Sequence, residues 1–265
     1  MNKPITSREY KLILNADRFV DCQLGIDSFW QLIEFLVKRQ QGRSNKDVKT
    51  KKRKTRYLDT ADFQLYRQKF ILRVRKEGKN KTKITLKYRH TDRYLSASQN
   101  LSCQNLPGDA TSECKFEEDI LASSLSNFSH SVSIKTKSKP PVKTIDDAIA
   151  LFPGLGKLGI SAGTQLTIVN QFIAHEFSYN LGYLDFDNGK TKIKAILNFW
   201  YLSEQKDFPS IKDFPLVVEF SFDYDANQPL HIVEQSQHFF EALKKQVDWI
   251  SQEAVTKTAY AYKIF

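Results

Sequence analysis

The sequence predicts an α+β fold, in which an antiparallel sheet of about eight strands closes into a barrel or tunnel and is flanked by helices. Segments with alternating apolar and polar residues recur along the whole chain, as half-buried strands require. Turn signals such as Gly78 and Asp187-Asn188-Gly189 join several of these segments as hairpins. A barrel is expected because closing such a sheet removes its unpaired edges.

The composition favours a globular protein with an anionic partner. The chain has 265 residues, of which 41% are hydrophobic and 26% charged, and we expect a single domain over residues 1–265. The net charge of +10 favours a negatively charged ligand. The three cysteines lack metal-ligand spacing, and no apolar run is long enough to cross a bilayer. We therefore expect a cytoplasmic protein without a membrane partner. The sequence does not indicate the oligomeric state.

The N-terminal part begins with a strand and a helix. Residues 7–14 alternate in polarity and predict a strand with Glu9 and Lys11 on one face. Residues 27–39 have apolar side chains at helical spacing and predict an amphipathic helix. The next segment, at about 42–55, is dominated by lysine and arginine, and we expect a mobile basic loop there.

The central hairpin carries the densest pattern of charge. Residues 70–77 and 81–90 are two alternating segments around a turn, and strand geometry places Arg73 and Arg75 on one face. Lys87 lies on the charged face of the return strand, among other cations. A solvated strand face would account for this pattern, and so would a face that binds phosphate oxygens. Repulsion between facing cations counts against the first interpretation.

The second half of the chain predicts further strands and helices. A polar loop at about 91–112 precedes a strand over 113–121, in which Lys115, Glu117 and Asp119 share one face. Further strands are expected over residues 166–179, 182–187, 190–202 and 214–225, and helices over 145–152, from 229 onward and over 254–265.

Many of the predicted strands keep one charged face, including the late strand that carries Glu219. In an open sheet these faces would be solvated. In a closed sheet they would meet in a lumen that holds arginines, lysines and carboxylates. Carboxylates bind hard divalent cations, and arginine and lysine bind the phosphates that such cations bridge. A closed sheet would therefore suit a phosphate compound.

Several segments carry a family resemblance, in order along nearly the whole chain. RYLDTADFQLYRQKFILRVR, followed by ITLKYR, resembles the central block of the CYTH superfamily, the triphosphate tunnel metalloenzymes. SREYKL is similar to the N-terminal Glu-x-Glu-x-Lys signature of that family, and KFEED to its Lys/Arg-x-Glu-x-acid strand. DNG resembles its Asp-x-Gly turn, VVEFSF its late Glu-x-Glu strand, and TKTAYAYKIF its terminal Ser-Lys segment.

The resemblance implies an enzyme of the thiamine triphosphatase or inorganic triphosphatase kind, which hydrolyses an inorganic, organic or nucleoside triphosphate with Mg²⁺ or Mn²⁺. Water would attack a phosphoryl group while metal and cations neutralise its charge. Lys11 would be the catalytic base if neighbouring cations lowered its pKa. The implied metal ligands are Glu9, Glu117, Asp119, Asp187 and Glu219, and the implied phosphate-binding residues are Lys11, Arg73, Arg75, Lys87, Lys115 and Lys257.

The chain departs from the family pattern where the family binds metal. Ser7 and Ser221 stand where the family carries glutamates, and Asn170 and Gln171 lie near a position that commonly carries arginine. Two alternatives to hydrolysis stay open, and Ser7 and Ser221 favour the second of them. One is nucleotide cyclisation of the adenylyl cyclase kind, and the other is binding of a polyphosphate or nucleotide without turnover. Nucleic acid ranks below these partners, because aromatic residues do not interleave with the basic segment as in single-strand readers.

Overall fold

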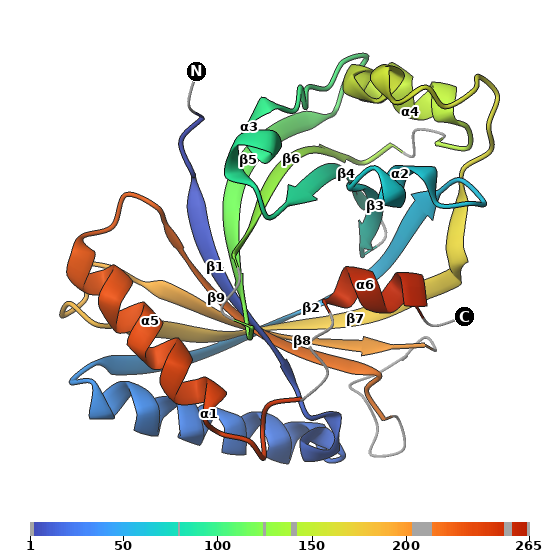
Figure 1. Ribbon diagram of the computed structural model, residues 1–265. Helices are drawn as coiled ribbons and strands as arrows, with labels where there is room; N and C mark the ends of the chain where they lie inside the picture. The colour runs from blue at the N-terminus through green and yellow to red at the C-terminus, as the bar shows by residue number, and fades with distance from the viewer. Residues whose placement is uncertain are drawn as a thin grey trace.

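The computed structural model describes residues 3–78, 80–123, 126–138, 142–202, 214–251 and 256–263 (Figure 1). Within these ranges nine strands form one closed barrel, in the order β1-β5-β6-β4-β3-β2-β7-β8-β9. The α+β class and the closed tunnel are therefore confirmed, with nine strands in the ring. The strands are β1 (Ser7–Leu14), β2 (Arg43–Asp59), β3 (Phe70–Glu77), β4 (Lys81–His90), β5 (Thr111–Leu121), β6 (Ser126–Thr136), β7 (Thr167–Asp185), β8 (Ile193–Tyr201) and β9 (Val217–Asp225).

The helices lie outside the ring or at its end. No helix within the described ranges is long and apolar enough to span a membrane. Part of the C-terminal helix predicted over 254–265 lies outside the described residues, and its described part is α6. The helices are α1 (Cys22–Arg39), α2 (Gln64–Arg67), α3 (Arg93–Ser98), α4 (Ile145–Leu151), α5 (Leu230–Lys244) and α6 (Lys257–Lys263), with 3-10 helices η1 (Ala16–Phe19) and η2 (Pro153–Leu158).

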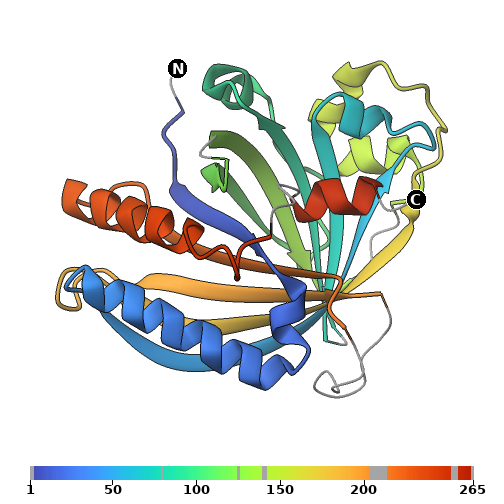
Figure 2. The same cartoon turned by 60° about the horizontal axis from the view of Figure 1, so that its bottom comes forward.

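Apolar side chains cover the outside of the barrel and pack against helices. α1 and α5 cover the outer faces of β1, β7, β8 and β9 (Figures 1 and 2). α2 and α4 cover the outer faces of β3, β4 and β6, where Phe70, Leu72 and Val74 are buried. Because successive side chains on a strand alternate, the charged residues of the same strands point into the ring. The parity predicted for the central hairpin is thereby confirmed.

Strand pairing is antiparallel throughout the ring, except that β1 and β5 run parallel. This parallel pair differs from the antiparallel barrel that we predict. It brings the segments SREYKL and KFEED side by side, because Ser7 pairs with Glu117 and Glu9 with Asp119. On its other edge β1 pairs with β9, so that Glu9 also lies opposite Asp223.

The basic loop predicted at about 42–55 is wrong, because these residues belong to β2. This strand pairs with β3 on one side and β7 on the other. Basic residues occupy both faces of β2, so the sequence does not alternate between apolar and polar residues as a half-buried strand does. The strand is recognised only from its pairing with β3 and β7. The polar loop predicted at about 91–112 is wrong in part: it contains α3, which Asp92 caps, and β5 begins at Thr111.

Two further differences concern element boundaries. The strands predicted over 166–179 and 182–187 are one strand, β7, with a register shift between Asn180 and Gly182. Gly182 has φ +138°, and a Cβ there would lie 1.9 Å from the carbonyl oxygen of Asn45 on β2. The glycine thus allows two strands to approach closely, and it does not end β7. Helix α1 begins at Cys22, earlier than predicted, because the Asp21 side chain accepts a hydrogen bond from the Leu24 backbone.

A cation-rich lumen as the candidate functional site

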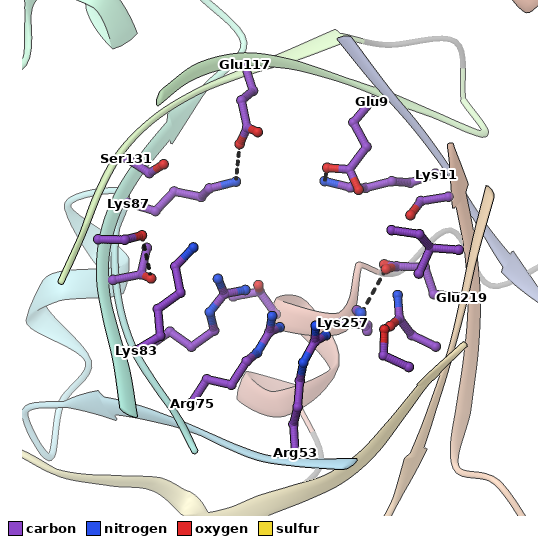
Figure 3. A pocket seen from close by; sticks show the side chains of 18 of the residues that line it. Glu9, Lys11, Arg53, Arg75, Lys83, Lys87, Glu117, Ser131, Glu219 and Lys257 are labelled. Atoms are coloured by element: carbon purple, nitrogen blue, oxygen red, sulfur yellow. Dashed lines mark hydrogen bonds and ion pairs between the residues drawn. The ribbon is translucent and has the colours of Figure 1, made fainter. Parts of the chain in front are cut away.

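The ring encloses a cavity of about 520 Å³ whose wall carries charged side chains from most strands. Figure 3 shows Arg53, Arg75 and Lys83 grouped on one side of this lumen, with Glu9 and Glu219 across from them. The basic side is built by β2, β3 and β4. The acidic residues come from β1, β5 and β9. Cations outnumber carboxylates among the described lining residues, so the lumen suits an anion of high charge.

The structure brings most of the predicted site residues into this lumen. Two of them do not line it. Asp119 is 1% exposed and is covered by Lys11, Lys87 and Arg89, which contact it. Asp187 lies in the β7–β8 turn, where its side chain accepts a hydrogen bond from the Thr191 backbone at 2.8 Å, so the structure gives it a role in the turn and does not join it to the other acidic residues. The predicted residues in the wall are Glu9, Lys11, Arg73, Arg75, Lys87, Lys115, Glu117, Glu219 and Lys257.

Glu176 on β7 is the central group of the basic side, and its side chain is fully buried. Its Oε1 accepts a hydrogen bond from Arg53 at 2.9 Å, and its Oε2 accepts one from the Trp200 indole at 2.8 Å. Arg75 and Lys257 lie 3.6 and 3.7 Å from Oε2. Burial opposes ionisation of Glu176, but these cations outweigh it and hold the pKa of the carboxyl far below its usual range. The carboxylate therefore holds the cluster of cations together.

Arg73 on β3 has the opposite character. It lines the lumen between Tyr57 on β2 and Thr85 on β4, and its Nε is buried without a hydrogen-bond partner among the described residues. Buried donors without a partner are rare in folded proteins, because each one loses its hydrogen bonds to water and forms no hydrogen bond within the protein to offset that cost. A guanidinium of this kind, directed at a cavity, is a donor for a bound anion.

Two lysines on β4 lose part of their affinity for protons in this environment. Burial, with the charges of Arg73 and nearby lysines, lowers the pKa of Lys83 to about 8. Burial also lowers the pKa of Lys87, although Asp119 and Glu117 oppose the shift. Lys83 therefore exchanges its proton near physiological pH in the empty protein. A bound polyanion would favour its charged form.

Lys11 does not meet the condition for a catalytic base. Its Nζ lies 2.7 Å from Asp119 and 2.8 Å from Glu9. Burial disfavours the ammonium, but these carboxylates more than offset burial and raise the pKa of Lys11 well above its usual value. The condition for a general-base role, a pKa lowered by neighbouring cations, is therefore not met, because the carboxylates of Asp119 and Glu9 outweigh the charge of Arg89. The raised pKa keeps the Lys11 side chain in its charged form.

The carboxylates predicted to bind metal are engaged with cations. Asp119 contacts Lys11 at 2.7 Å and Arg89 at 3.0 Å, and Glu219 contacts Lys257 at 2.8 Å. Among the described residues, no three acidic, histidine or cysteine side chains converge as metal ligands. The donor set does not fit a resident Mg²⁺ or Mn²⁺, each of which prefers several free oxygen ligands.

The two serines that the sequence resemblance aligns with glutamates supply hydroxyls in place of carboxylates. Ser7 donates a hydrogen bond to Glu117 at 3.3 Å, and Ser221 lines the lumen opposite Lys11. A glutamate at either position would add negative charge where the structure has a hydroxyl. Asn170 and Gln171, near the expected arginine, have φ of 49° and 54° and form an irregular part of β7, where the Asn170 amide donates to the Ala261 carbonyl on α6.

Asp223 is an acidic residue for which the structure gives a testable pH effect. Burial and the facing Glu9 raise its pKa to about 6. A carboxyl with a raised pKa in the folded state destabilises that state once pH exceeds the unfolded value, about 4. Asp223→Asn should therefore raise the melting temperature at pH 7.5 by about 2–5 °C, with the gain disappearing near pH 4. Asp225→Asn, at the exposed end of the same strand, is the control. An equal gain at both pH values would contradict this account.

Sequence reasoning missed several residues of the lumen. Arg53, Lys49 and Lys51 were assigned to the basic loop, although their alternate spacing is that of one strand face. Lys83 and Arg89 share the face of Lys87, so parity alone could have added them. Glu176 gave no signal, because one acidic residue within an apolar strand has no pattern. Lys194 on β8 also lines the lumen and was not predicted.

Two solved structures are similar to this chain over nearly its full length. A candidate adenylyl cyclase from Hippeastrum, described as having a dominant triphosphatase activity, matches with a TM-score of 0.50 and 11% identity over 97% of this chain and 95% of that chain. A candidate adenylate cyclase from Bacillus halodurans is 15% identical, with a TM-score of 0.42 over 97% of each chain. No protein-family model and no curated protein sequence matches the chain.

The closed ring and its polar lumen define the class of fold. The similarity to the Hippeastrum protein extends over nearly the full length of both chains. The closed tunnel that the resemblance implies is therefore confirmed as a fold. At this identity the likeness concerns the fold alone, so the activity is argued from the residues of the lumen.

Proposed function

We propose that this protein binds a triphosphate compound in its lumen and hydrolyses it to a diphosphate compound and phosphate. The observation that carries the proposal is the set of cations that line the cavity, and above all the buried Nε of Arg73, which has no hydrogen-bond partner among the described residues. A linear triphosphate carries several negative charges along a flexible chain. It would satisfy cations on β2, β3 and β4 at the same time, as the separate phosphoryl groups contact separate strands.

The cations would also act in the reaction. Water attacks the terminal phosphorus in line with the bridging oxygen, the bond to that oxygen breaks and leaves the diphosphate, and the proton of the water passes to an oxygen of the phosphate that is formed. The transition state is loose and needs little help from a base, so positioning and charge neutralisation account for most of the catalysis. Arg73, Arg75 and Lys87 would neutralise the phosphoryl oxygens and the leaving group. A divalent ion that accompanies the triphosphate would be part of the substrate.

An assay of phosphate release tests hydrolysis. The compounds are inorganic triphosphate, thiamine triphosphate and nucleoside triphosphates, each with Mg²⁺, with Mn²⁺ and with chelator. We expect release from at least one of these compounds, and a loss of that release in Arg75→Gln. Binding of a triphosphate without release would contradict hydrolysis and leave the binding proposal in place.

The second candidate function is binding of a polyphosphate or nucleotide without turnover. It is favoured by the ion pairs that occupy Glu9, Asp119 and Glu219, since these carboxylates would have to release their cations in order to hold a metal.

The free thiols of Cys22, Cys103 and Cys114 support a reducing compartment, and we propose the cytosol for either function.

Proton uptake should accompany binding of a triphosphate. At pH 8 about half of the Lys83 side chains are neutral in the empty protein, and the bound anion should protonate them. The affinity contributed by Lys83 should therefore fall as pH rises through about 8. Calorimetry in Tris and in HEPES measures the protons exchanged. Lys83→Arg keeps a fixed charge and should take up about half a proton less than the unmodified protein. Equal uptake by both proteins would contradict the role of Lys83.

A further inference from the structure

A cysteine, a histidine and a lysine meet on the outer face of the barrel, on the side of the wall that faces away from the lumen. They are Cys114 on β5, His130 on β6 and Lys3 in the segment that leads into β1. β1, β5 and β6 are consecutive strands of the ring (Figure 1). The Sγ atom of Cys114 lies 3.4 Å from Nζ of Lys3 and 3.5 Å from Nε2 of His130. The three side chains therefore form one polar cluster.

The backbone of three neighbouring segments holds this cluster together. The β5–β6 register pairs Phe116 with His130, so Cys114, two residues before Phe116, is a diagonal neighbour of the imidazole on the same face. On the other side of β5, the backbone N–H of Thr6 donates to the carbonyl of Phe116 at 2.7 Å. The segment before β1 thus runs beside β5 and brings Lys3 to Cys114.

His130 serves as a hydrogen-bond acceptor for the ammonium of Lys3. Its imidazole is only 2% exposed and meets the Phe116 ring edge to face, with centroids 6.0 Å apart. Burial and the charge of Lys3 lower the pKa of His130 to about 4, so the imidazole is neutral at pH 7. Its Nε2 contacts Nζ of Lys3, and because an ammonium can only donate, Nε2 is the acceptor. The buried imidazole therefore fixes the position of Lys3 beside the sulfur.

Cys114 is the exposed thiol of the chain, whereas Cys22 is buried and Cys103 is partly buried. A cysteine reacts as its thiolate, and a cation that contacts the sulfur favours that form. Thiolates that small molecules can reach exchange with disulfides, while buried structural thiols are inert. Cys114 combines exposure with a fixed ammonium, so its surroundings are those of a reactive thiol.

We propose that Cys114 is a modification site that forms a mixed disulfide with low-molecular-weight disulfides. The Cys114 thiolate attacks one sulfur of the small disulfide, a new bond forms between these two sulfurs, and the original sulfur–sulfur bond breaks. The second sulfur leaves with the electron pair and takes up the proton that Cys114 gave up. Cys114 is oxidised and the leaving sulfur is reduced. Lys3 stabilises the attacking thiolate, and His130 is a positioning residue for Lys3.

Reaction with oxidised glutathione at pH 7, followed for each cysteine by peptide mass spectrometry, tests this site. The reference is Cys114→Ser combined with Ser112→Cys, which moves the thiol by two residues along β5 to another exposed position. We expect Cys114 to react at least about tenfold faster than the displaced thiol. Lys3→Met removes the ammonium and should slow Cys114 by at least about fivefold.

A matched control removes a different nearby charge. Lys135 on β6 contacts Glu113, the residue before Cys114, at 2.8 Å. Lys135→Met should change the rate at Cys114 by less than about twofold, because its ammonium is bound to a carboxylate and solvent screens it.

His130→Phe tests the positioning of Lys3. Phenylalanine keeps a buried aromatic ring but has no Nε2. The variant should slow Cys114 about as much as Lys3→Met, and the double variant should be no slower than either, because both changes remove one interaction. The melting temperature should not fall, since the change also removes a buried Nδ1 that has no hydrogen-bond partner among the described residues. Additive slowing in the double variant would contradict the positioning role.

Three results would each overturn the assignment of Cys114 as the reactive thiol. They are equal rates at positions 112 and 114, an unchanged rate in Lys3→Met, and a glutathione adduct on Cys103 but not on Cys114. If His130→Phe does not fold, the comparison of Lys3→Met with Lys135→Met still decides. None of these measurements involves a phosphate compound, so their failure would leave the proposed function in place.

Discussion

Arg73→Gln is expected to weaken binding of inorganic triphosphate by about tenfold to a hundredfold while leaving the melting temperature unchanged or slightly raised. The loss corresponds to about 1.5–3 kcal/mol, the contribution of a hydrogen bond to a charged group. The stability should not fall, because the guanidinium has an unpartnered Nε and stands near other cations. Its repulsion is felt by Arg75, whose pKa is lowered to about 10 by burial and by the charges of Arg73 and Arg53.

Calorimetric titration and thermal unfolding of the same samples test this prediction. Arg56→Gln is the matched control, because Arg56 lies on β2 as an exposed residue, outside the lumen wall. It should change triphosphate affinity by less than about twofold. An unchanged affinity in Arg73→Gln would return the hairpin to the interpretation of a solvated basic face. A large loss of stability would instead assign Arg73 a structural role.

Glu176→Gln is expected to have the largest effect on stability of any single change in the lumen. The fully buried carboxylate lies within 4 Å of Arg53, Arg75 and Lys257. Removing one partner of a buried ion cluster costs about 3–5 kcal/mol, since the remaining charges stay buried without compensation. We expect the melting temperature to fall by on the order of 10 °C. The depressed pKa of Glu176 means that this stabilisation is present at neutral pH and is lost as pH falls below about 4.

A surface carboxylate provides the comparison. Glu113 on β5 contacts Lys135 at 2.8 Å, and both side chains are partly exposed to solvent. Glu113→Gln should cost less than about 1 kcal/mol, as is usual for exposed ion pairs. Triphosphate should stabilise Glu176→Gln by more degrees than it stabilises the unmodified protein, because the ligand replaces the lost negative charge. Equal destabilisation by the two variants would contradict the central role of Glu176.

The sequence correctly predicts the strands of the tunnel wall in which one face is apolar and the other is charged. Strand parity on β3 and β4 places Arg73, Arg75 and Lys87 together, and it does the same for Glu117 on β5 and Glu219 on β9. The period of two survives in these strands because helices bury their outer faces. The lumen could therefore be predicted as a basic cavity with a few carboxylates.

The parts that sequence reasoning missed depend on contacts between distant segments. Strand β2 has basic residues on both faces, and it is ordered by pairing with β3 and β7 rather than by its own pattern. Strand β6 places serines inward, a residue type that also predicts loops. The shift in the pKa of Lys11 follows from carboxylates on β1 and β5, and the parallel pairing that joins these strands has no signal in the sequence. Asp187 was proposed as a metal ligand from a three-residue turn motif. In the structure its carboxylate accepts a hydrogen bond within that turn and does not reach the lumen.

The position of a bound triphosphate tests the central claim most directly. A crystal structure of the protein with saturating inorganic triphosphate should show phosphate density inside the ring, with oxygens at about 3 Å from Arg73 and within contact of Lys83 and Lys87. The ion pairs of Glu176 with Arg53 and Arg75 should persist beside it. Triphosphate bound only on the outer surface, with the lumen free of phosphate while calorimetry records binding, would contradict the assignment of the lumen as the site.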